Sequence, residues 1–207
     1  MPQIDEIITA KEMDCGEEHT LILDTEGSIW SFGLNLNGQL GLGHNKQINK
    51  PEKIQKFCQN KIKHIISESD ISFAISENGE SYMWPIKNSA GNISYLPKFL
   101  NLPEKISWIT CGGGFAMFLN VNGMVYSMGR DNTYGQLGHG DTQPRLKPTL
   151  IETFHLNNDR VSQISCGNKH CVAKTFTNKA YTWGLVSYFF ILVFIKFLFF
   201  NFIFFDD

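Results

Sequence analysis

The chain has 207 residues, of which 18 are basic and 20 acidic, and 43% are hydrophobic. This length permits one sizeable domain or two small ones, each with a buried core. The net charge of −2 excludes the basic surface that is typical of nucleic-acid-binding proteins, so we expect no direct nucleic acid binding. The first residues, MPQIDEIITAKEMD, are acidic and lack an apolar run, so they do not predict a secretory signal.

The first predicted elements form a short antiparallel unit. Ala10 and Met13 indicate a weak first strand, and the apolar residues 21 to 23 indicate a second. The sequence DTEG, ending at Gly27, is typical of a hairpin turn because glycine accepts a positive φ. A third strand follows and contains Trp30. A glycine-rich phrase, GQLGLGH, comes next at residues 38 to 44.

The same unit returns three times along the chain. Segments of 19 residues begin at residues 15, 67, 111 and 166 and align without gaps, so the repeat is about 50 residues long. Each copy predicts a strand, a second buried strand, a tight turn and a third strand. No helical period separates these hairpins, which indicates an all-β fold. A period of about 50 residues made of short antiparallel strands is typical of propeller blades. The four segments read CGEEHTLILDTEGSIWSFG, SESDISFAISENGESYMWP, CGGGFAMFLNVNGMVYSMG and CGNKHCVAKTFTNKAYTWG.

This pattern resembles the RCC1 repeat of the regulator-of-chromosome-condensation family. The resemblance rests on CGEEH followed by WSFGLNLNGQLGLG in the first copy, and on CGGGF followed by YSMGRDNTYGQLGHGD in the third. The second copy is degenerate and the fourth stops at Gly184. The resemblance implies a partial β-propeller of four-stranded blades, with repeats at about 7–60, 61–105, 106–160 and 161–184. The family's propellers have seven blades, so the chain supplies about three and a half. It is then either a fragment or half of a ring completed by a second copy.

Repeat equivalence assigns structural roles to residues that could otherwise suggest chemistry. Cys15, Cys111 and Cys166 occupy one position in different blades, so we expect small buried side chains there and no disulfides. His19 and His170 are equivalent to Ile71 and Phe115, which indicates a packing position. The glycine phrases match no phosphate-binding fingerprint, and Cys166, His170 and Cys171 lack a fourth zinc ligand. We therefore predict no catalytic residue, no metal and no cofactor. The predicted structural positions are Cys15, Gly16, His19, Gly27, Trp30, Gly33, Gly38, Gly41, Cys111, Gly112, Gly123, Tyr126, Gly129, Gly135, Gly138, Cys166, Gly167, His170, Tyr181 and Gly184.

The last segment, residues 185–207, differs in composition from the rest. Residues 186–205 read VSYFFILVFIKFLFFNFIFF, which is long enough to cross a bilayer as a helix despite Lys196. One interpretation is a transmembrane tail anchor that leaves the repeats facing the cytosol. A second is a gene-model artefact, in which AT-rich noncoding DNA has been read through after the interrupted fourth copy. A third is a buried or aggregating strand. Without an anchor, we expect a cytoplasmic or nuclear protein.

Two functional classes follow from the resemblance. Founding members of the family act as guanine-nucleotide exchange factors for the small GTPase Ran, which requires no covalent chemistry. Many other RCC1-like domains are protein-protein interaction platforms. The inserted wedge used for exchange is not visible in this sequence, so we carry over no exchange residue. The predicted function is a platform that binds a protein partner, and exchange on a Ran-like small GTPase is the alternative.

Overall fold

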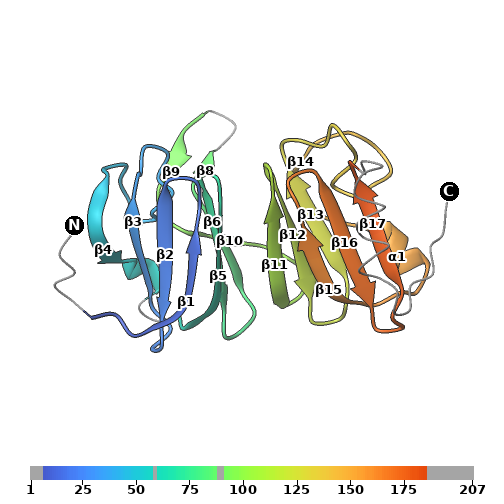
Figure 1. Cartoon of the computed structure of the whole chain (residues 1–207), viewed down its shortest axis with the longest axis horizontal. Helices are drawn as coiled ribbons and strands as arrows, with labels where there is room; N and C mark the ends of the chain where they lie inside the picture. The colour runs from blue at the N-terminus through green and yellow to red at the C-terminus, as the bar shows by residue number, and fades with distance from the viewer. Residues whose placement is uncertain (1–6, 58–59, 88–90, 186–207) are drawn as a thin grey trace, which may run out of the picture. The chain divides into compact units, whose positions relative to one another are not determined.

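The computed structural model describes residues 7–57, 60–87 and 91–185, and these residues form antiparallel sheets (Figure 1). The chain divides into two compact units between Ile106 and Ser107. Each unit contains two of the predicted repeats. The expected all-β fold class is confirmed, with four successive blades in chain order.

The first unit holds two four-stranded blades. The first blade has the order β1-β2-β3-β4, and the second has the order β10-β7-β6-β5. A separate two-stranded hairpin, β8-β9, lies between β7 and β10 in the sequence. The strands are β1 (Ala10–Cys15), β2 (His19–Asp24), β3 (Ile29–Gly33), β4 (Ile48–Lys53), β5 (Ile62–Glu68), β6 (Ile71–Ser76), β7 (Ser81–Trp84), β8 (Ile86–Lys87), β9 (Ile93–Ser94) and β10 (Lys98–Leu100), with a short 3-10 helix, η1, at Gln55–Phe57.

Within the described residues, the second unit repeats the two blades with one strand fewer and without the separate hairpin. Its first blade has the order β11-β12-β13-β14, and its second has β15-β16-β17 within the described residues. The outer edge of β17 therefore has no strand partner in the part of the chain that the structure describes. The elements are β11 (Ile106–Gly112), β12 (Phe115–Asn120), β13 (Val125–Gly129), β14 (Arg145–Leu150), α1 (Glu152–Leu156), β15 (Val161–Cys166), β16 (His170–Thr175) and β17 (Ala180–Gly184).

Each unit has its own apolar core, formed between its two blades. In the first unit Leu21, Ile65 and Trp84 are among the residues at most 1% exposed. Met117 and Val125 are fully buried in the second unit. The helical turns η1 and α1 add Phe57 to the first core and Phe154 to the second. Burial of these side chains is the main force that holds neighbouring blades together within a unit.

Candidate binding site

The glycine-rich loop of the second unit is held by its own polar side chains. Asn132 accepts a hydrogen bond from the Leu137 amide at 2.9 Å, and its Nδ2 donates to the carbonyls of Asp141 and Gln143 at 3.0 and 2.8 Å. The Ser127 hydroxyl donates to the Leu137 carbonyl at 2.7 Å. These side chains are buried within the loop, so their polar groups fix its shape.

The loop of the first unit uses the same contacts. Asn35 accepts from the Leu40 amide at 3.0 Å and donates to the His44 and Lys46 carbonyls at 2.9 and 3.0 Å. Ser31 donates to the Leu40 carbonyl at 2.8 Å. The glutamines also accept within the loops, Gln39 from the Asn37 amide at 3.0 Å and Gln136 from the Tyr134 amide at 2.9 Å. The asparagine and glutamine of the N-x-x-G-Q-L-G phrase are therefore loop-shaping residues in both units. The sequence predicted the turn but not these hydrogen bonds, although the recurrence of asparagine three residues before the first glycine was a visible signal.

The equivalent cysteines are less buried than their spacing predicted. Cys15 is exposed, and Cys111 and Cys166 are partly buried. The expectation of burial is wrong for Cys15 because alternate side chains of β1 face solvent at the edge of its blade. The Cys166 and Cys171 sulfurs lie 3.6 Å apart as free thiols. This hydrogen bond, together with burial, holds the pKa of the Cys171 thiol above its usual range.

His19 is the most perturbed histidine among the described residues. Its side chain is 3% exposed, and Nε2 lies 2.8 Å from the Ser72 hydroxyl, which in turn donates to the Gln39 carbonyl at 2.9 Å. Burial lowers the pKa of His19 to about 4, although Asp70 and Asp14 act in the opposite direction. A neutral imidazole at neutral pH therefore connects β2 to β6. The equivalent His170 is only partly buried.

Most of the remaining predicted positions lie in turns or at the ends of strands. Trp30, Tyr126 and Tyr181 lie on third strands, and Tyr181 donates a hydrogen bond to Asp159. Burial, followed by this hydrogen bond, raises the pKa of Tyr181 to about 12. The glycines adjoin first strands (Gly16, Gly112, Gly167), complete hairpin turns (Gly27, Gly123), end third strands (Gly33, Gly129, Gly184) or lie in the glycine-rich loops (Gly38, Gly41, Gly135, Gly138).

A cap on each hairpin turn was not predicted from the sequence. Asp24 Oδ1 accepts hydrogen bonds from the Glu26 and Ser28 amides at 3.0 and 2.7 Å, and Oδ2 accepts from the Trp30 indole at 2.8 Å. Asn120, Ser76 and Thr175 occupy the same position in the other copies. Asn120 accepts from both equivalent amides, and Ser76 and Thr175 each accept from the second of them. The signal in the sequence is a small polar residue three positions before the turn glycine or asparagine.

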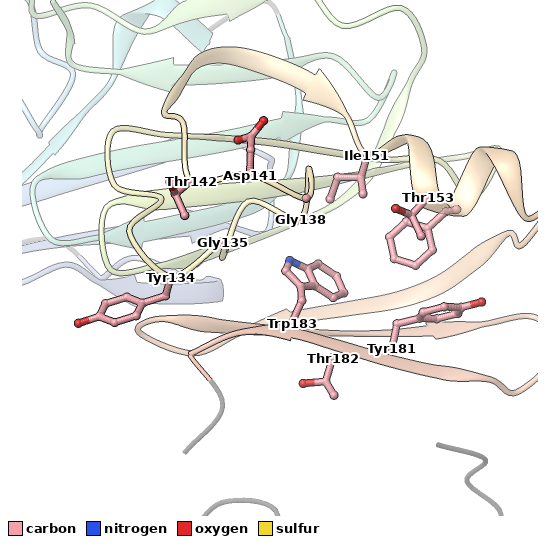
Figure 2. A pocket seen from close by; sticks show the side chains of 12 residues that line it. Tyr134, Gly135, Gly138, Asp141, Thr142, Ile151, Thr153, Tyr181, Thr182 and Trp183 are labelled. Atoms are coloured by element: carbon pink, nitrogen blue, oxygen red, sulfur yellow. The ribbon is translucent and has the colours of Figure 1, made fainter. Parts of the chain in front are cut away.

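A groove of about 420 Å³ lies on the second unit beside β17. Figure 2 shows the Trp183 ring standing on β17 and directed toward the loop that carries Gly138. Trp183 and Tyr181 are only partly buried, and Phe154 from α1 packs against both rings at 5.8 and 5.2 Å. The groove is therefore an aromatic surface bounded on one side by a glycine-rich loop and on the other by a strand edge.

The hairpin turns of the second unit carry exposed apolar side chains. Val121 is 57% and Phe176 is 69% exposed, and they occupy the same position in their two turns. The turns are linked through the backbone, because the Gly123 carbonyl accepts from the Val161 amide and the adjacent Arg160 carbonyl accepts from the Phe176 amide, both at 2.9 Å. In the first unit the equivalent residues are Thr25 and Glu77, which are polar.

Two predictions concern metals and membranes. Within residues 7–57, 60–87 and 91–185, no group of three or more metal-ligating side chains is found. Over the same residues, no helix combines the length and the apolar character needed to cross a bilayer. The predicted transmembrane or artefactual tail, residues 186–205, lies outside the described residues.

Comparison with known proteins places these blades in a family. Sequence profiles of the "Regulator of chromosome condensation (RCC1) repeat" match residues 26–75 and 122–173, and in a second form residues 10–39, 107–136 and 161–188. The chain belongs to the RCC1-repeat family. The resemblance drawn from the repeated cysteine, glycine and aromatic positions is thereby confirmed.

Three relatives illustrate the range of this RCC1-repeat family. The ultraviolet-B receptor UVR8 of Arabidopsis thaliana is 36% identical over 186 residues, which are 86% of this chain and 41% of the receptor. A mouse RCC1-like G exchanging factor-like protein is 29% identical over 193 residues, 82% of this chain and 40% of that protein. Yeast RCC1 (Prp20), solved bound to Kap60, superimposes with a TM-score of 0.69 and 28% identity, covering 84% of this chain and 43% of that one. The chain therefore spans less than half the length of these relatives.

Proposed function

We propose that this chain is a protein-protein interaction platform whose partner-binding surface includes the hairpin turns of the second unit. The observation that carries the proposal is the pair of exposed apolar side chains, Val121 and Phe176, on adjacent turns. Contiguous apolar side chains on a surface are typical of protein-binding sites because contact with a partner removes them from water. The exposed Arg160 lies between these turns, where its carbonyl accepts from the Phe176 amide and its side chain begins beside Gly123, which favours a partner surface that is apolar and acidic.

The relatives support this proposal without identifying the partner. Yeast RCC1 has been solved in a complex with Kap60, so an RCC1-repeat chain of 28% identity engages another protein. Polar residues fill the equivalent positions of the first unit, Thr25 and Glu77. The two units therefore present different surfaces despite their common fold, and the second offers the apolar contact.

The test compares two matched substitutions in the tagged full chain. Phe176→Asp places a charge on the apolar turn, and we expect it to reduce recovery of specific partners at least about fivefold, measured by quantitative mass spectrometry. Thr25→Asp changes the equivalent, already polar turn of the first unit and serves as the control. Equal recovery with both variants, at unchanged circular dichroism, would reject this surface.

Nucleotide exchange on a Ran-like small GTPase is the second candidate function. The name of the mouse G exchanging factor-like relative favours it, at 29% identity over 82% of this chain. The test is release of a fluorescent guanine nucleotide from purified Ran in the presence of the full chain. Accelerated release would establish exchange activity, whereas an unchanged rate with a folded sample would reject it.

A further inference from the structure

The first unit contains an arrangement equivalent to the groove of the second unit, but its tryptophan is more deeply buried. The Trp84 indole donates to the Gln39 carbonyl at 2.8 Å, and the Trp183 indole donates to the Gln136 carbonyl at 2.9 Å. Phe57 lies 5.8 Å from Trp84, the separation that Phe154 keeps from Trp183. Trp84 is nevertheless fully buried, whereas Trp183 remains partly exposed.

In the first unit, residues 95–100, which lead into and form β10, cover the glycine-rich loop at Gly38 and Gly43. A β-carbon at Gly38 would lie 2.3 Å from the Tyr95 ring, so the tyrosine rests directly on the glycine backbone. The Gly43 amide donates to the Tyr95 carbonyl at 3.2 Å, and Leu96 lies beside Gly43. Further along, Phe99 meets the Tyr82 ring edge-on at 5.9 Å.

Backbone pairing holds the same covering segment. Strand β10 runs antiparallel to β7, with Lys98 opposite Met83 and Phe99 opposite Tyr82. The covering sequence is therefore Tyr-Leu-Pro-Lys-Phe-Leu, at residues 95 to 100, lying extended across the glycine loop and along the strand edge. Pro97 cannot donate a backbone hydrogen bond, and it precedes the first residue of the paired strand.

In the second unit, the corresponding positions are open among the described residues. The glycines equivalent to Gly38 and Gly43 are Gly135 and Gly140. A β-carbon at Gly135 would meet only the Asp141 carbonyl at 3.8 Å, and one at Gly140 would meet nothing within 4 Å. Tyr181, equivalent to Tyr82, is likewise only partly buried on β17. The places that Tyr95 and Leu96 fill in the first unit are therefore unfilled by the described residues of the second.

We propose that this groove and the outer edge of β17 bind an extended segment of a partner protein with the pattern aromatic-Leu-Pro-x-aromatic-Leu. The first aromatic side chain rests on Gly135, the leucine lies against Gly140, and the second aromatic ring packs on Tyr181. The segment pairs with β17 as an added strand, a recognised mode of peptide binding. This inference rests on the proposed function as a protein-binding platform, but it concerns a surface other than the Val121 and Phe176 turns.

The test measures fluorescence anisotropy of a labelled peptide, NISYLPKFLN, titrated with the full chain. This peptide has the sequence of residues 92 to 101. We expect saturable binding. Gly135→Ala should weaken it at least about tenfold, because the peptide tyrosine would meet a β-carbon at the separation of 2.3 Å found at Gly38. Gly140→Ala should change affinity less than about threefold, since the leucine contact at Gly43 is 3.3 Å.

Gly140→Ala is a matched control because the two glycines have nearly the same positive φ. Their φ angles are +72° at Gly135 and +75° at Gly140, so alanine introduces the same strain at each in the free protein. A peptide with alanine in place of its tyrosine extends the control. This alanine peptide should bind the native chain more weakly than NISYLPKFLN does. Gly135→Ala should then cause no further loss of affinity for the alanine peptide, as in a double-mutant cycle.

Several outcomes would overturn the inference. These are no saturable binding of the peptide to the full chain, and equal affinity of the Gly135→Ala and Gly140→Ala variants for the peptide. Phe176→Asp should leave peptide affinity unchanged. Peptide binding combined with equal partner recovery by Phe176→Asp and Thr25→Asp would therefore reject the turn surface alone. Reduced partner recovery by Phe176→Asp without peptide binding would reject the groove alone.

Discussion

His19 shows at the scale of one residue how burial sets a chemical property. Its pKa is lowered to about 4 from an ordinary 6.5 because the imidazole is buried. The unfolded chain therefore binds a proton at a higher pH than the folded chain does. The stability that neutral His19 provides is complete above pH 6.5 and is lost as the pH falls toward 4. By linkage the loss amounts to about 3 kcal/mol.

Replacing this histidine should remove that pH dependence. The equivalent position holds Phe115 in the third copy, which is 4% exposed, so His19→Phe suits the fold. We expect the variant to lose less stability than the native chain between pH 6.5 and 4, measured by urea denaturation across this range. His170→Phe, at the partly buried equivalent, is the control. If the unfolding free energies of the native chain and of His19→Phe fell in parallel between pH 6.5 and 4, His19 would not be the source of the pH dependence.

Asp24 provides a second prediction at this scale. It is 9% exposed and accepts three hydrogen bonds, from two turn amides and the Trp30 indole. Burial alone would raise the pKa of this carboxyl, but the hydrogen bonds together lower it. Asp24→Ala should cost about 2 to 3 kcal/mol of unfolding free energy at neutral pH. Asp24→Asn should cost about 1 kcal/mol, because Asn120 caps its turn through the same oxygen. Equal losses in denaturation would contradict this account.

At the scale of elements, the glycine-rich loops depend on one asparagine each. Asn132 makes three hydrogen bonds to the backbone and is 2% exposed. We expect Asn132→Ala to lower the unfolding free energy by about 2 to 4 kcal/mol, since three buried backbone groups lose their partner. The exposed Asn122→Ala should stay within about 0.5 kcal/mol. Chemical denaturation of both variants tests the difference, and similar midpoints would show that the loop holds its shape without this side chain.

The strands differ in how far their sequences predicted them. The first three strands of each copy follow from recurring apolar residues and a turn signal, as in β5 with Ile62 and Ile65. The fourth strands were implied only by the family resemblance and not by a residue pattern, because β4 reads INKPEK and none of its side chains is buried. Its pairing with β3 is made by backbone groups, which leave no side-chain pattern.

At the scale of the whole molecule, the two cores are separate clusters with equivalent members. Leu21 in the first cluster and Met117 in the second occupy the same repeat position, and both are fully buried. Each substitution to alanine should cost about 2 to 5 kcal/mol. Because the two residues share no packing partner, the double variant should lose the sum of the single effects within about 0.5 kcal/mol. Thermal and urea denaturation of all three variants would reveal a coupling that contradicts this independence.

The sequence by itself determined the repeat period, the all-β class, the family and the positions of the turns. These properties are local: a strand needs its own apolar residues, and a turn needs its own glycine or asparagine. Only the tertiary structure decided that His19 is buried against Ser72, that Cys15 is exposed and that Trp183 lines a groove while Trp84 is covered. Trp84 packs against Gly41 and Tyr95 rests on Gly38, so residues far apart in the chain meet at the same loop. Packing between distant residues leaves no periodic signal in a single sequence, so it becomes visible only when the chain is folded.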